Sequence, residues 1–197
     1  MDGFQRRKEE KMNNILEAAL QLFMEFGIQK VSISQIAKKA NVSQVTIYNY
    51  FDSKHNLIRE VFIYYTDNVT LEFEKLINSE LPFPDKIKQI IFNKKKAANQ
   101  LHEELYEYFL KEYREEGNHL QKLYAEKVLP QIMSFFEDGK KEGFINKNLS
   151  NEAILFYFQM MTDYFKKEET YQQLLPLTED IMQILFYGIL GKDPSTN

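Results

Sequence analysis

The chain has 197 residues, 44% of them hydrophobic, with a formal net charge of −4 and no cysteine. The hydrophobic content suffices for a sizeable core, and the lack of cysteine excludes disulfides, thiolate metal sites and cysteine nucleophiles. The sequence has no run of about 18 uncharged apolar residues, and its charged start is unlike a secretory signal. We therefore expect a cytoplasmic protein that does not span a membrane.

The charge is unevenly distributed along the chain. Residues 1–60 contain 9 Lys+Arg and 7 Asp+Glu, a net charge of +2, whereas the remainder carries −6. Four basic residues stand at the leading edge of the first predicted helix, where they either follow a phosphate backbone or remain solvated: Arg6, Arg7, Lys8 and Lys11. This modest positive balance favours DNA binding through specific contacts over sequence-blind binding.

The first predicted helix has apolar residues at three-and-four spacing from Ile15 and ends at Gly27. After it, the sequence predicts a helix, a tight turn and a second helix. Ser32 followed by Gln35 is a capping-box start. Asn41 stands where a chain leaving a helix often needs a left-handed residue. Ser43 then caps the next helix by accepting a hydrogen bond from the Thr46 amide.

Residues 42–51 predict a short helix with an unusual exposed side. At about 100° per residue, Ile47 and Phe51 share one face, which we expect to be buried. The other positions face away from it: Val45 and Asn49 point the opposite way, and Thr46 and Tyr48 lie on the flanks. This helix therefore has a packed side and a side available for reading a partner.

A fourth helical pattern follows through Leu57, Ile58, Val61 and Phe62, preceded by Asp52-Ser-Lys54, which offers a cap and a cation. Lys54 would lie beside the amino-terminal amides of this helix, and an ammonium together with those amides favours a phosphate.

Taken together, these positions resemble the DNA-binding half of the tetracycline-repressor (TetR) family. The resemblance covers roughly the first sixty residues and is carried by Gly27, Val31-Ser-Ile, Ile36-Ala37, Ala40-Asn-Val-Ser43, Thr46-Ile-Tyr48, Phe51 and Ser53-Lys54. The family often has Gly where Asn41 stands and Lys-Gly where Gln44-Val45 stands. Neither departure blocks the fold, and both bear on the target sequence.

The resemblance implies that residues 43–51 form the recognition helix, with DNA contacts at Gln44, Val45, Thr46, Tyr48, Asn49 and Lys54. Gln44 can pair with an adenine and Val45 can pack on a thymine methyl. The hydroxyls of Thr46 and Tyr48 and the Lys54 ammonium suit phosphates. Asn49 either reads an adenine or contacts a phosphate or a water molecule. For Ser32 the main expected role is that of a helix N-cap, and the alternative is a phosphate contact. The alternative for Gln44, Val45 and Asn49 is an ordinary solvated helix face.

Every segment past residue 60 is predicted to be helical. Pro82-Phe-Pro84 separates one helix from the next, and another runs near residues 101–113 and stops around Gly117. A long helix from about His119 contains Pro130, which should kink it. It ends at Gly143, expected in the left-handed conformation.

The last two helices predict an assembly. Residues 153–165 are apolar on almost every side, and an amphipathic helix follows between Leu177 and Leu190. We expect a homodimer in which two helices from each chain form the interface, as the resemblance also implies; the alternative is that both helices are interior to a monomer. Two recognition helices about 34 to 36 Å apart would then read an inverted repeat in double-stranded DNA.

A small-molecule effector is implied by the resemblance, because family members release DNA when a ligand binds the larger domain. Candidate pocket residues are Tyr65, Phe92, Tyr106, Phe109, Tyr124 and Phe158, although core packing is the competing explanation for each. Glu103, Glu104 and Glu107 favour a cationic lipophile or form a solvated face. The three histidines have no ligand spacing, so we expect no metal site and no cofactor.

The sequence thus predicts an all-α protein with a helix-turn-helix DNA-binding domain at residues 1–55 and a helical ligand-binding and dimerisation domain at residues 56–197. The expected function is a ligand-responsive transcriptional regulator, most simply a repressor. The alternative is a dimeric helical module that binds a protein or ligand and no longer binds DNA. No catalytic motif is present, so we expect no enzyme.

Overall fold

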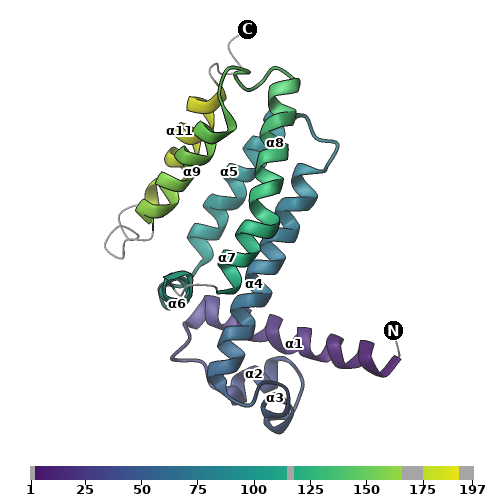
Figure 1. The fold of residues 1–197 in the computed structure, drawn as a ribbon. Helices are drawn as coiled ribbons and strands as arrows, with labels where there is room; N and C mark the ends of the chain where they lie inside the picture. Colours follow the sequence, from purple (N-terminus) through teal and green to yellow (C-terminus); the bar gives the residue numbers. More distant parts are fainter. Residues whose placement is uncertain (1–2, 115–117, 166–174, 191–197) are drawn as a thin grey trace. The chain divides into compact units, whose positions relative to one another are not determined.

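A computed structural model describes residues 3–114, 118–165 and 175–190 (Figure 1). These residues form helices and no strands, which confirms the predicted all-α class. In chain order the helices are α1 (Gly3–Phe26), α2 (Ile33–Lys39), α3 (Gln44–Phe51), α4 (Lys54–Ile77), α5 (Phe83–Gln100), α6 (Glu103–Arg114), α7 (His119–Leu123), the π-helical turn η1 (Tyr124–Val128), α8 (Leu129–Lys141), α9 (Asn151–Phe165), the 3-10 turn η3 (Leu175–Leu177) and α11 (Thr178–Leu190). The predicted stop at Gly117 lies outside the described residues.

The helices form two compact units. The N-terminal unit comprises residues 1–69 and 100–120, and the C-terminal unit comprises residues 70–99 and 121–197. The N-terminal unit therefore includes α6 as well as the three helices that the sequence assigned to residues 1–55. A domain boundary at residue 55 remains a prediction.

One apolar core holds the N-terminal unit together. Ile15, Ala19 and Phe23 of α1 are buried against side chains from α2, α3, the start of α4 and α6: Ile36, Ile47, Phe51, Leu57, Val61 and Leu105. Each of these helices places its apolar stripe in the same core, which is why α2 and α3, at seven and eight residues, are stable despite their length.

A second core lies in the C-terminal unit. α5 contributes Phe83, Ile87, Ile90 and Ile91, α8 contributes Phe135 and Phe136, and α9 and α11 add Ile154, Leu185 and Phe186. Gly139 allows α8 to approach this core closely, because a Cβ there would lie 2.5 Å from the Phe83 ring.

Pro130 lies near the start of α8, directly after a π-helical turn. Because proline has no N–H, it cannot make the backbone hydrogen bond expected in the helix interior. The chain adapts by widening the preceding turn, where the Leu129 N–H donates to the Tyr124 carbonyl. The predicted disturbance at Pro130 is thus accommodated by a π turn within a continuous helical segment.

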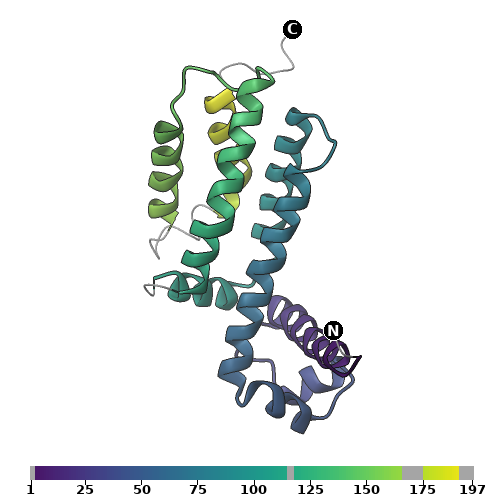
Figure 2. The same ribbon diagram turned by 45° about the vertical axis from the view of Figure 1, so that its right-hand side comes forward.

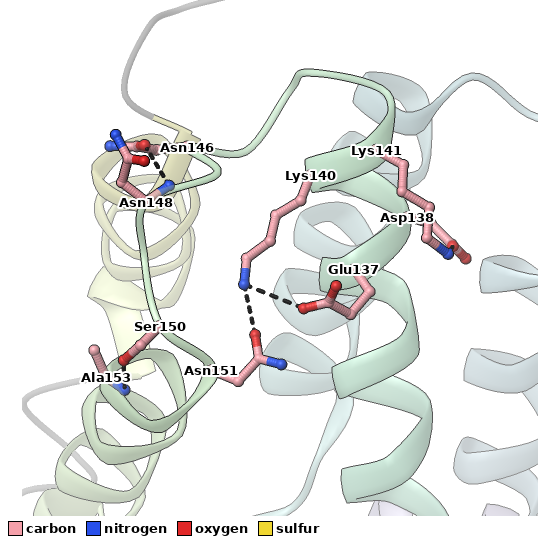
Figure 3. A network of polar contacts seen from close by, with 9 residues as sticks. All are labelled: Glu137, Asp138, Lys140, Lys141, Asn146, Asn148, Ser150, Asn151 and Ala153. Carbon is pink, nitrogen blue, oxygen red and sulfur yellow. Dashed lines mark hydrogen bonds and ion pairs between the residues drawn. The ribbon is translucent and has the colours of Figure 1, made fainter.

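A polar network joins the end of α8 to the start of α9 (Figure 3). The Lys140 ammonium donates to Glu137 at 3.2 Å and also to Asn151. Hydrogen bonding with Asn151, and then with Lys140, lowers the pKa of Glu137. At the start of α9 the Ala153 N–H donates to the Ser150 hydroxyl at 3.1 Å, so Ser150 caps the helix.

Candidate nucleic-acid interface

The predicted helix–turn–helix is present, with both caps in place. The Gln35 N–H donates to the Ser32 hydroxyl at 3.3 Å and the Ser32 N–H donates to the Gln35 amide oxygen at 2.7 Å, a complete capping box. Asn41 adopts a left-handed conformation with φ of 53°. The Thr46 N–H donates to the Ser43 hydroxyl at 3.0 Å. Short local signals therefore define the ends of both helices as the sequence predicted.

α3 has the packed side and the exposed side that its spacing predicts. Ile47 and Phe51 are buried, whereas Val45 is 66% and Tyr48 46% exposed. Gln44 and Asn49 are also exposed. An apolar residue and a tyrosine on the water-facing side of so short a helix contribute nothing to the core beneath it, so both side chains are available to a partner.

Two of the predicted contact residues already make hydrogen bonds within the protein. The Thr46 hydroxyl lies 2.8 Å from the Ser43 hydroxyl. The Lys54 ammonium donates to the Ile28 carbonyl at 2.8 Å and is partly buried. Lys54 therefore fastens the turn between α1 and α2, a role that the sequence did not suggest because the two residues are 26 positions apart. Its phosphate contact remains a prediction.

An open hollow of about 520 Å³ lies beside α3, lined by Phe4, Arg7, Lys8, Lys11, Asn49 and Tyr50. Three cations from α1 thus lie next to an amide and a tyrosine from α3. Arg6, by contrast, pairs with Glu10 of its own helix at 3.5 Å. The structure separates the basic residues of the first helix into three that adjoin α3 and one that does not.

The sequence carried a signal for this hollow. Phe4, Arg7, Lys8 and Lys11 follow the spacing i, i+3, i+4 and i+7, which places them on one helix face. What the spacing alone did not indicate is that this face adjoins the end of α3. That arrangement depends on the packing of α1 in the shared core.

α6 is attached to the turn between α1 and α2. The Gln29 N–H donates to the Glu104 carboxylate at 2.8 Å, and Leu105 is buried in the shared core. Gly27 lies directly beneath, with φ of +80°, and a Cβ there would lie 2.7 Å from the His102 ring and 2.9 Å from the Glu104 carboxyl carbon. Glu104 thus makes a structural contact, and the role of Glu103, Glu104 and Glu107 beside a ligand remains a prediction.

The comparisons with known proteins agree with this geometry. Residues 15–61 match the family model described as bacterial regulatory proteins, tetR family. The chain is 30% identical over 138 residues to the uncharacterized HTH-type transcriptional regulator YhgD of Bacillus subtilis, covering 66% of this chain and 70% of YhgD. The chain belongs to the TetR family.

Other relatives extend the likeness. YvdT of Bacillus subtilis, another uncharacterized HTH-type transcriptional regulator, is 50% identical over 48 residues, or 24% of this chain and 25% of YvdT. The crystal structure of the regulator FadR from Bacillus subtilis in complex with stearoyl-CoA has a TM-score of 0.55 at 22% identity, covering 89% of this chain and 98% of FadR. This likeness shows the shared fold. The chain is accordingly a TetR-family transcriptional regulator, and regulators of this family bind DNA and typically act as dimers.

The predicted effector contacts fall into two groups within this TetR fold. Tyr65 stacks on Phe109 at 5.2 Å in the N-terminal unit, which also holds Tyr106. In the C-terminal unit, Phe158 packs on Phe136 at 5.4 Å and Tyr124 begins the π turn. Phe92 is exposed on the side of α5 opposite its buried isoleucines, which turns it away from that core. The pocket role of all six residues remains a prediction.

The helices α9 and α11 and the turn η3 expose apolar side chains. Phe156 is 71% and Ile184 66% exposed, and Met160, Leu177 and Tyr187 are also exposed. The side chains of residues 161–165 and 189–190 lie outside the described part of the chain. Within the described ranges, no helix is both long and apolar enough to span a membrane, and no cluster of three or more potential metal ligands occurs.

Proposed function

We propose that this TetR-family regulator is a repressor that binds an inverted-repeat operator as a homodimer and is released by a small, largely apolar ligand. The observation that carries the DNA-binding part is the exposed side of α3, where Val45 and Tyr48 face water opposite the buried pair Ile47 and Phe51. Gln44 and Val45 would read bases in the major groove, and Tyr48 would position the helix on a phosphate.

The hollow beside α3 extends the proposed interface. Arg7, Lys8 and Lys11 would contact phosphates next to the groove occupied by α3, where Asn49 also lies. Each phosphate neutralised in this way adds affinity that falls as the salt concentration rises. These contacts compensate for the overall negative charge of the chain, because they concentrate positive charge beside the recognition helix.

The exposed apolar face of α9 and α11 supports dimerisation. Phe156 and Ile184 are large side chains that a second copy would remove from water. Gly188 lies one turn beyond Ile184 with no side chain near it, which would let two α11 helices approach closely. Dimerisation in turn fixes the separation of two α3 helices, which is why an inverted repeat is the proposed target.

A ligand-binding role is supported by the shared fold, since FadR, which has this fold, was crystallised with stearoyl-CoA. A ligand that prefers the conformation unable to bind DNA would shift the population away from the DNA-bound form. We propose the same logic for this chain, with an apolar ligand in the C-terminal unit.

The decisive experiment selects genomic fragments bound by the purified full-length protein and then measures their affinity by fluorescence anisotropy. We expect the selected fragments to share an inverted repeat. Tyr48→Phe should weaken binding to all fragments alike, whereas Gln44→Ala should relax the base preference at one position per half-site. Tyr64→Phe, on α4 and outside the proposed interface, is the matched control for the tyrosine hydroxyl. Failure to enrich any fragment would favour the alternative of a helical module that does not bind DNA.

Dimerisation is tested separately by sedimentation. Ile184→Glu should convert the protein to a monomer and abolish operator binding, because a charge would be buried in the interface. An unchanged sedimentation coefficient would place the interface elsewhere.

A further inference from the structure

The first turns of α1 lie outside the core of the N-terminal unit. The first described side chain of this helix to pack against that core is Met12, and the first to be buried is Ile15. Residues 3–11, the leading segment of α1, precede both and extend the helix by about 14 Å at 1.5 Å per residue. The leading segment projects past α2 and α3 in Figure 1 and is turned toward the viewer in Figure 2. It also precedes residues 15–61, which match the family model, so neither core packing nor the shared motif accounts for it.

One face of the leading segment combines a large apolar side chain with cations. Phe4 is 67% exposed and shares its helix face with Arg7, Lys8 and Lys11, which are also exposed. Phe4 belongs to neither of the two apolar cores. The cations attract an anion, and the aromatic ring gains from contact with an apolar surface. A partner that suits this face is therefore anionic and also offers an apolar surface.

The hollow beside α3 has the composition expected for holding one phosphate strand of a duplex. Phe4 and the three cations form its α1 side, and Asn49 and Tyr50 form its α3 side. The two carboxylates of the leading segment, Glu9 and Glu10, do not line it. With α3 in a major groove, the phosphate strand at the edge of that groove would lie in this hollow.

Phe4 is the lining residue of α1 that lies farthest from the core. Lys11 adjoins Met12, which packs against the core, whereas Phe4 precedes Lys11 by seven residues, about 10 Å along the helix. A phosphate strand separates the major groove from the minor groove, so a side chain that reaches past the strand meets the minor groove. A homeodomain uses this arrangement, with one helix in the major groove and an arm in the adjacent minor groove.

We propose that the leading segment of α1 is a second DNA-reading element, in which Phe4 enters the minor groove beside each half-site while Arg7, Lys8 and Lys11 hold the intervening phosphate strand. An apolar ring has no hydrogen-bond donor or acceptor for the base edges, so Phe4 selects DNA by its deformability. Pyrimidine–purine steps such as TA and CA unstack most readily. The operator should therefore carry such a step at a flanking position that α3 does not contact. This role of Phe4 rests on the proposed DNA-binding function and adds a specificity determinant outside α3.

A duplex selection with the full-length protein tests the proposal. The probe is the inverted repeat recovered from genomic fragments, with the base pairs on both sides of each half-site randomised. Wild-type protein should enrich a TA or CA step at one fixed flanking position, and anisotropy should show about tenfold tighter binding to that duplex than to one with a GC step there.

Variants of Phe4 separate the flanking preference from the reading by α3. Phe4→Ala should lose the flanking preference and keep the preference within the half-sites, whereas Phe4→Leu should retain both, because leucine also serves as an apolar wedge. Phe26→Ala, at the opposite end of α1 and 43% exposed, is the matched control for loss of an exposed ring. Urea unfolding should give the same midpoint for Phe4→Ala and wild type, since Phe4 packs in neither core.

A fluorescent base analogue reports the unstacking directly. Aminopurine placed at the preferred step should brighten when wild-type protein binds and stay unchanged with Phe4→Ala. The proposal is overturned by wild-type protein that enriches no flanking step, by a Phe4→Ala variant that keeps the preference, or by aminopurine that does not brighten. Each of these results leaves the proposed function standing, whereas recovery of no inverted repeat would overturn both.

Discussion

Replacing Gly27 by alanine should destabilise the N-terminal unit by two separable effects. Gly27 has φ of +80°, a conformation that costs an alanine about 1–2 kcal/mol. The added methyl would also lie 2.7 Å from the His102 ring and 2.9 Å from the Glu104 carboxyl carbon. Both side chains can move, but moving Glu104 breaks its hydrogen bond to the Gln29 amide. For an exposed bond of this kind the loss is about 1 kcal/mol, so we expect a total of roughly 2–3 kcal/mol.

A matched variant separates the two effects. Gly143 has nearly the same conformation, with φ of +83°, and no atom within 4 Å of an added Cβ. Gly143→Ala should therefore show the backbone cost alone. Urea unfolding followed by circular dichroism measures both variants, and Glu104→Ala combined with Gly27→Ala completes a double-mutant cycle. The reasoning is refuted if Gly27→Ala costs no more than Gly143→Ala, or if the Gly27 and Glu104 effects simply add.

Three other variants test separate parts of the molecule. Arg7→Gln should weaken operator binding, and the slope of log Kd against log salt concentration should fall by about 0.9 for each phosphate that is no longer neutralised. Fluorescence anisotropy measures both quantities. An equal effect of Arg6→Gln would argue against a role for the hollow. Gly139→Ala should lower the unfolding free energy by about 1–3 kcal/mol through overpacking, and an unchanged urea midpoint would contradict the close approach of α8 to its core. Hydrogen bonding, chiefly with Asn151, lowers the pKa of Glu137 in the folded protein. The ionised Glu137 side chain therefore stabilises the fold above the ordinary carboxyl pKa, and this contribution is lost as the pH falls through the lowered pKa of the folded state. The stability gap between wild type and Glu137→Gln should accordingly narrow in acid, and a gap that widens would reverse this assignment.

The features that the sequence predicted well depend on residues close together in the chain. Each helix cap joins two residues that are three positions apart, Ser32 with Gln35 and Ser43 with Thr46. The left-handed conformations of Asn41 and Gly143 follow from the position of each residue directly after a helix. Local chemistry determines each of these, so no knowledge of the tertiary structure was needed.

The features that the sequence did not predict depend on distant residues. Lys54 donates to the Ile28 carbonyl and Glu104 accepts from the Gln29 amide, 75 positions away. Neither contact leaves a periodic pattern, because each requires that two helices first pack in the shared core.

The shortness of α3, the recognition helix of the proposed interface, has a consequence for how operator preference would change among relatives. Its ends are fixed by Ser43 and by the left-handed Asp52, and its attachment depends on Ile47 and Phe51. A helix of this length would not persist alone in water, so these four positions supply nearly all of its order. The water-facing positions Gln44, Val45, Tyr48 and Asn49 have no part in the core, so in the proposed interface substitutions there would alter the bases recognised while leaving the fold intact. On this proposal, new binding specificities would be accessible by single substitutions, without compensating changes in the core.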